Sequence, residues 1–178
     1  PGPVSERGPG GQDGLVERAP DLQVPSADGT RIAVFRSGTP GASPLVLVHG
    51  AAADHTTFRV LGPLLADGFD LFAIDRRGRG ASGDTVPYAI DREFEDVAAV
   101  ATAVAEATGR ATVDVFGHSY GGRCALGAAL LPAPIRRVIS YEGAPTPEGE
   151  RYGDSGLAER LAVLASSGED EALLTLFM

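Results

Sequence analysis

The stretch Gly117-His118-Ser119-Tyr120-Gly121 places a serine between two glycines, directly after the apolar run Ala111 to Phe116. This order is typical of a nucleophile elbow, in which a strand enters a sharp turn and a helix leads away from it. The turn holds the serine backbone in a strained conformation and exposes its hydroxyl. Glycines are expected on both sides because side chains there would collide inside so tight a turn.

The neighbouring residues decide how much weight this motif carries. In a chain with 24 glycines, a bare Gly-x-Ser-x-Gly pattern arises easily by chance. Here Val113, Val115 and Phe116 favour a strand before the serine. A small, apolar helix is predicted from Tyr120, and it stops at Pro132 because proline cannot continue a helix. The sequence therefore predicts the strand, turn and helix that a nucleophile elbow requires.

A second apolar run, Pro44 to Val48, is short and continuous, as expected for a strand buried on both faces of a parallel sheet. It ends in His49-Gly50-Ala51, where small residues would let the backbone approach a substrate. A carbonyl attacked by Ser119 develops negative charge on its oxygen, and two backbone N–H groups can stabilise that charge. We expect these donors to be the N–H groups of Ala51 and Tyr120.

A third apolar run, Phe69 to Ile74, leads into the glycine-rich turn Asp75-Arg76-Arg77-Gly78-Arg79-Gly80-Ala81-Ser82-Gly83. The order of the His-Gly loop, this turn and the Gly-His-Ser-Tyr-Gly-Gly motif resembles the α/β-hydrolase family over roughly residues 22–141. Three motifs in the family's order are far more specific than any one of them. The arginines of the turn are expected to be solvated or salt-bridged.

The resemblance implies an α/β fold with a mostly parallel sheet flanked by helices and a helical cap inserted after the sixth strand. We expect a flexible lead-in over 1–20, the N-terminal part of the hydrolase core over 21–142 and the start of the cap or lid over 143–178. The chain supplies about six of the eight strands the family implies, so the C-terminal strands are expected beyond Met178. Residue patterns predict a hairpin of 22–25 and 31–37, an irregular helix over 56–66, a helix over 91–108 ended by Gly109, and two short helices over 156–166 and 169–178.

The chain departs from the family in its general base. Family members carry the base histidine after the acid and near the C-terminus, but the three histidines here are His49, His55 and His118, and none follows Ser119. His49 is expected to pack the oxyanion loop, and His118 is expected to point away from the nucleophile. His55 could face the pocket, and a solvated or substrate-contacting histidine is expected there rather than a substitute base. The family order places the base beyond Met178.

The acid of the catalytic triad has one candidate within the chain. Val138 to Tyr141 is predicted as the next strand, and Glu142 stands at its end. Some α/β hydrolases place the acid after this strand, where it can orient the histidine and stabilise the imidazolium. The alternative, which we favour, is that Glu142 caps the strand or contacts the cap. The more usual position of the acid lies beyond Met178.

Composition limits the partners. The net charge of −9 and the pI of about 4.7 disfavour binding to a nucleic-acid backbone. No cluster has metal-ligand spacing, and Gly78-x-Gly80 lacks the rest of a dinucleotide fingerprint, so neither metal nor cofactor is expected. No apolar stretch reaches the roughly 20 residues that span a bilayer, and no signal peptide is recognised. We expect a soluble, cytoplasmic protein that acts on a small molecule.

These observations predict a serine hydrolase that cleaves an ester, thioester or lactone through an acyl-enzyme on Ser119. Serine at the elbow argues against the dehalogenases and epoxide hydrolases of the family, which use aspartate there. Two alternatives stay open: a hydrolase-like scaffold that binds a ligand without catalysis, and a cofactor-free relative that makes peracids or cleaves carbon–carbon bonds with the same triad.

Overall fold

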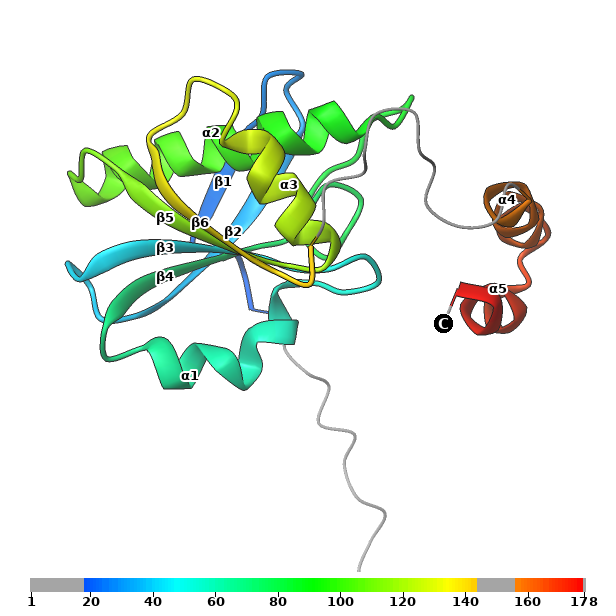
Figure 1. The fold of residues 1–178 in the computed structure, drawn as a ribbon, viewed down its shortest axis with the longest axis horizontal. Helices are drawn as coiled ribbons and strands as arrows, with labels where there is room; N and C mark the ends of the chain where they lie inside the picture. Colours follow the sequence, from blue (N-terminus) through cyan, green and yellow to red (C-terminus); the bar gives the residue numbers. More distant parts are fainter. Residues whose placement is uncertain (1–17, 144–155, 178) are drawn as a thin grey trace, which may run out of the picture.

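The computed structural model describes residues 18–143 and 156–177 of the 178-residue chain. Its centre is one six-stranded sheet, shown in Figure 1. The strands are β1 (Leu22–Pro25), β2 (Arg31–Gly38), β3 (Ser43–Val48), β4 (Phe69–Ile74), β5 (Val113–His118) and β6 (Ile135–Tyr141). The helices are the 3₁₀ helix η1 (His55–Arg59), α1 (Leu61–Leu65), α2 (Ile90–Thr108), α3 (Tyr120–Ala128), α4 (Leu157–Ser167) and α5 (Asp170–Phe177).

The strand order β1-β2-β4-β3-β5-β6 places β3, which precedes the His-Gly loop, next to β5, which precedes the serine. The pairs of β4 with β3, β3 with β5 and β5 with β6 are parallel, whereas the β1–β2 hairpin and the β2–β4 pair are antiparallel. Val48 lies opposite Gly117 in the β3–β5 register. Since parallel strands end at the same edge, the loops after β3 and β5 meet there.

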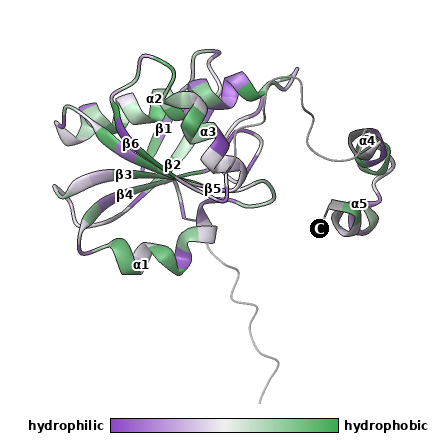
Figure 2. Cartoon of the chain, viewed as in Figure 1, coloured by the Kyte–Doolittle hydropathy of each residue, from purple (hydrophilic) through white to green (hydrophobic). Residues whose placement is uncertain are grey.

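One face of the sheet is covered by α2 and α3 (Figure 1). The apolar stripe of α2 lies in this core, and Phe94 packs so closely on α3 that a Cβ at Gly127 would lie 2.4 Å from its ring. Gly109 ends α2 in the left-handed conformation and donates its N–H to the carbonyls of Ala105 and Glu106, as a C-terminal glycine does. The strands beneath are predominantly apolar (Figure 2).

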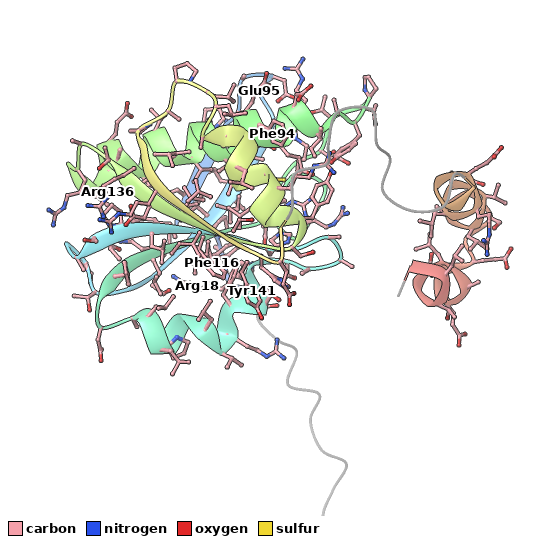
Figure 3. All side chains as sticks on the ribbon, in the orientation of Figure 1. Arg18, Phe94, Glu95, Phe116, Arg136 and Tyr141 are labelled. Carbon is pink, nitrogen blue, oxygen red and sulfur yellow. The ribbon has the colours of Figure 1, made fainter. Side chains whose placement is uncertain are left out.

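The opposite face is covered by η1 and α1 and holds a smaller cluster of Leu45, Leu47, Phe58, Leu71 and Ala73. Figure 3 shows Phe94 in the layer of α2 and α3 and Phe116 on the side of α1. The rings of Phe58 and Phe116 meet edge to face at 6.2 Å. At the edge of the sheet, Ile139 and Tyr141 of β6 are more than half exposed.

The predicted architecture is confirmed: an α/β fold with a mostly parallel sheet flanked by helices. The hairpin and the helix ended by Gly109 lie where the residue patterns place them. The predicted irregular helix over 56–66 is divided into η1 and α1, and the Asp54 carboxylate caps the start of η1 by accepting the Thr56 N–H.

The division of the chain into lead-in, core and cap stays a prediction. Residues 1–17 and 144–155 lie outside the described residues. The two helices expected after this segment are present as α4 and α5, which contact each other. Within 18–143 and 156–177, no helix combines the length and hydrophobicity needed to cross a membrane.

Candidate active site

Ser119 joins β5 to α3 with backbone angles of φ 52° and ψ −121°. Only two non-glycine residues in the described part of the chain have positive φ, and this is one of them. The conformation is held from both sides: the Ser119 N–H donates to the Tyr141 carbonyl at 2.8 Å, and its carbonyl accepts the Gly122 N–H at 2.9 Å. Few non-glycine residues adopt a positive φ, and a serine held in that conformation at the end of a strand has the backbone geometry of a nucleophile elbow.

The elbow leaves no room for side chains at its glycines. A Cβ at Gly117 would lie 2.3 Å from the carbonyl oxygen of Gly121, and one at Gly121 would lie 2.3 Å from that of Val48. Both obstacles are backbone atoms, which cannot turn aside as a flexible side chain can. The first turn of α3 therefore packs directly onto the end of β3.

The loop after β3 lies against the nucleophile. A Cβ at Gly50 would lie 3.4 Å from the Cβ of Ser119. Within the described residues, the N–H groups of Ala51 and Tyr120 donate to no acceptor. Both residues line a cavity of about 160 Å³. Ser119 itself does not line this cavity, so the availability of the two predicted oxyanion donors rests on their lack of an acceptor in the described part of the chain.

His49 is fully buried beneath this loop. Its Nε2 accepts the Arg76 backbone N–H at 3.0 Å, so its Nδ1 carries the proton and donates to the Gly50 carbonyl at 2.8 Å. Burial lowers the pKa of this imidazole to about 4, so it is neutral at pH 7. These bonds agree with the expected packing role of His49.

The buried, neutral His49 predicts acid sensitivity. The unfolded state takes up a proton near pH 6.5 and the folded state near pH 4, so stability falls as the pH drops through this interval. Urea unfolding should show a loss of about 3 kcal/mol over that window. His49→Gln, which keeps an acceptor but does not titrate, should remove this part of the slope, whereas the exposed-site control His118→Asn should retain it. An unchanged slope in His49→Gln would contradict the assignment.

A buried charged network lies beside the same loop. Arg76 donates to both carboxylate oxygens of Glu93 at 2.6 Å and to the Gly50 carbonyl at 2.7 Å. Burial by itself raises the pKa of Glu93, but the hydrogen bonds from Arg76 hold it below its usual value. The sequence patterns do not predict this pair, because Glu93 is an acidic residue in the first turn of a helix, where acidic side chains are common without a partner.

Tyr88 extends the network to the residue after the nucleophile. Its hydroxyl donates to Glu93 at 3.0 Å and accepts from the Tyr120 hydroxyl at 2.5 Å, because a carboxylate can only accept. Burial raises the pKa of Tyr88, which keeps the hydroxyl protonated. The ring of Tyr120 is thereby tied to the same carboxylate that holds Arg76.

Two of the three arginines in the turn, Arg76 and Arg77, form salt bridges. This agrees with the salt-bridged alternative that the sequence left open for the turn. Arg77 is buried and forms a two-pronged pair with Asp96, and it also donates to Asp28 at 3.0 Å. Arg79 is exposed and donates to the carbonyls of Ala51 and Gly78. The turn therefore contributes to internal structure more than to a basic surface.

His55 lies near the Asp75 carboxylate rather than in contact with Ser119. Its Nδ1 and its backbone N–H both bond the same oxygen of Asp75 at 2.8 Å, and its ring stacks on Phe35 at 3.5 Å. It lines a separate cavity with Phe35 and Phe58. None of the described hydrogen bonds joins His55 to Ser119, and its expected substrate contact stays a prediction.

Asp54, His55 and Asp75 bring three possible metal ligands close together. Asp54 caps η1 through Thr56, and Asp75 accepts hydrogen bonds from His55 and from the Ala81 N–H. Hydrogen bonds within the protein therefore explain why these three side chains lie close together, and we assign no metal to them.

Glu142 stands at the end of β6, beside the elbow. It is the second non-glycine residue with positive φ, at 58°, and a Cβ at the next residue, Gly143, would lie 2.6 Å from the Ser119 carbonyl oxygen. Its carboxylate lies 3.5 Å from Nε2 of His118, whose ring stacks on Tyr141. Both residues are partly or largely exposed. The structure thus places the backbone of the candidate acid beside the elbow, with its carboxylate next to His118, the residue before the nucleophile.

Comparison with known proteins gives concordant matches. A sequence profile described as the alpha/beta hydrolase fold matches residues 43–162. N-formylmaleamate deformylase from Pseudomonas putida is 32% identical over 153 residues, which cover 82% of this chain and 55% of that protein. An alpha/beta hydrolase structure from Sphaerobacter thermophilus has a TM-score of 0.73 at 39% identity and covers 88% of this chain and 59% of its own.

A third similar protein is named for a reaction other than hydrolysis. The bottromycin epimerase BotH, solved in complex with bottromycin A2, is 33% identical with a TM-score of 0.65, over 80% of this chain and 55% of its own. In all three cases the chain spans between 55% and 59% of the length of its relative.

Proposed function

Because the chain belongs to the α/β-hydrolase fold family, we propose that it acts as a serine hydrolase on the acyl carbonyl of an ester, thioester or lactone of a small molecule. The observation that carries the proposal is the strained Ser119 backbone, with φ 52°, beside two N–H groups that have no acceptor among the described residues. A scaffold without catalysis has no need of such a conformation. The relative named a deformylase supports attack on an acyl carbon.

In the proposed reaction, Oγ of Ser119 bonds to the carbonyl carbon while its proton passes to a general base. The carbonyl π electrons move to oxygen, and the N–H groups of Ala51 and Tyr120 stabilise that oxyanion. The bond to the leaving group then breaks, the base returns the proton to the leaving group, and an acyl-enzyme remains. Water, deprotonated by the same base, releases the acid and restores the serine.

The general base and the acid of the triad complete the proposed mechanism. No hydrogen bond joins a histidine to the side chain of Ser119 in the described part of the chain, and the expectation of a base histidine after Met178 stays a prediction. Glu142 stays a candidate acid, supported by its place beside the elbow. Such an acid would orient the base and stabilise its charged form.

A second candidate is a ligand-binding scaffold, or a relative with non-hydrolytic chemistry. It is favoured by the structural neighbour named an epimerase. Peracid formation and carbon–carbon cleavage would use the same nucleophile and oxyanion donors, so they differ from the main proposal only in the acceptor or the bond that breaks.

A fluorophosphonate probe on the full-length protein separates catalysis by an activated serine from a ligand-binding scaffold. Only an activated serine displaces fluoride from the probe and forms the Oγ–P bond, so we expect one adduct by intact mass. The adduct should be lost in Ser119→Ala and kept in Ser37→Ala, which changes an exposed serine of β2. An unlabelled wild-type protein would contradict the hydrolase and favour the scaffold.

A further inference from the structure

The carbonyl of Gly50 belongs to the same peptide group as the N–H of Ala51. It accepts two hydrogen bonds, from Nη1 of Arg76 at 2.7 Å and from Nδ1 of His49 at 2.8 Å. Two donors use both lone pairs of the oxygen. Because a peptide group is planar and trans, its N–H points opposite to its C=O. The bonds to Gly50 therefore set the direction of the Ala51 N–H.

Arg76 also contacts the residue that carries the second donor. Its guanidinium carbon lies 4.6 Å from the centre of the Tyr120 ring, within the range of a cation–π interaction. The far end of that ring is held through its hydroxyl, which donates to Tyr88. The guanidinium and Tyr88 thus fix the Tyr120 side chain at its face and its tip, at the first residue of α3.

Arg76 itself is held rigidly. Glu93 accepts from it at two points, the side chains of the pair are 5% and 3% exposed, and the Arg76 backbone N–H donates to His49. Two-pronged pairing of a planar guanidinium with a carboxylate fixes orientation as well as position. A charged donor on the Gly50 carbonyl should also polarise that peptide and strengthen its N–H as a donor.

We propose that Arg76, held by Glu93, is a positioning residue for the oxyanion hole: it aims the Ala51 N–H through the Gly50 carbonyl and fixes Tyr120 through its ring. The inference rests on the proposed function, because it assigns a role in stabilising the oxyanion of that same reaction. The proposed role of Arg76 is exerted through the two donors, with which it also lines the cavity of about 160 Å³.

The adjacent arginine provides a matched control. Arg77 is as buried as Arg76 and forms the same two-pronged pair, with Asp96 at 2.7 Å. Its further bonds go to Asp28 and to the Arg92 carbonyl, not to the loop after β3. Lysine at either position loses the planar fork and keeps the charge. Both variants should lose stability, but only Arg76→Lys should disturb the oxyanion donors.

The test uses the full-length protein, a chromogenic ester and a trifluoromethyl ketone. The ketone reports on the oxyanion directly: Oγ of Ser119 adds to its carbonyl carbon, the π electrons become the oxyanion, and the serine proton passes to the base. We expect Arg76→Lys to lower kcat about 100-fold while KM stays within about threefold of the wild-type value. The affinity for the ketone should fall by a factor similar to that in kcat. Arg77→Lys should keep both kcat and ketone affinity within about threefold.

A second variant covers the case in which Arg76→Lys does not fold. Arg76→Gln with Glu93→Gln removes both charges and leaves no buried ion unpaired, and it should show the same loss of kcat and ketone affinity. Equal kcat losses in Arg76→Lys and Arg77→Lys, or a higher KM with kcat unchanged, would overturn the inference while wild-type turnover still supports the hydrolase. A wild-type protein that neither turns over esters nor reacts with the probe would overturn the proposed function, and the inference with it.

Discussion

Replacing Ser119 with alanine is expected to lower kcat of the full-length enzyme about 10⁶-fold, as removal of a triad nucleophile does. Alanine keeps the backbone and the two oxyanion donors but has no oxygen to form the acyl-enzyme. Steady-state hydrolysis of a chromogenic ester measures the loss. Substrate binding should persist, because the side chain that is removed contributes to bond formation rather than to the pocket walls.

The structure provides an internal check on this result. The elbow is held by backbone hydrogen bonds of residue 119 to Tyr141 and Gly122, and alanine retains both. Thermal unfolding of Ser119→Ala should therefore match that of the wild type, which separates a chemical defect from a folding defect. A variant that keeps more than about a tenth of wild-type turnover would exclude Ser119 as the nucleophile.

Gly121→Ala is expected to destabilise the fold by about 3 kcal/mol or more, at the upper end of what single substitutions cost. The new Cβ would lie 2.3 Å and 2.4 Å from the carbonyl oxygens of Val48 and His49. Neither oxygen can move without shifting the end of β3, so the helix must separate from the sheet. Urea unfolding of the full-length protein, analysed for both midpoint and slope, measures the change.

The matched control is Gly62→Ala in α1. A Cβ at Gly62 would meet no atom within 4 Å. Since alanine has a higher helix propensity than glycine, this variant should be unchanged or more stable, by up to about 1 kcal/mol. If Gly121→Ala unfolded at the same urea concentration as the wild type, the close contact between α3 and β3 would be wrong.

The sheet was largely predictable because each strand is encoded locally. Continuous apolar runs such as Leu45 to Val48 and Leu71 to Ile74 are typical of strands buried on both faces, and the structure buries both runs in the interior of the sheet, where β3 and β4 pair in parallel. The edge was harder to predict. The last strand begins at Ile135, before the predicted Val138, because pairing with β5 determines its length and Arg136 and Arg137 mask its pattern.

The candidate site divides in the same way. Ser119, Ala51 and Tyr120 belong to local motifs, so the sequence was enough to propose them. The pairing of Arg76 with Glu93 is a tertiary contact between a turn and a helix 17 residues away, and buried ion pairs leave no hydrophobic pattern. One signal was present. Two arginines follow a buried strand, and two acids three residues apart, Glu93 and Asp96, lie beside the apolar positions of the next helix.

The two residues with unfavourable backbone angles, Ser119 and Glu142, end adjacent parallel strands. At both positions glycine would adopt the observed φ without steric cost. Folding alone therefore gives no reason to keep a side chain at either place. Relatives that have lost the activity could therefore carry glycine at both positions. A comparison of related sequences at these two positions would show whether selection for chemistry has kept both side chains.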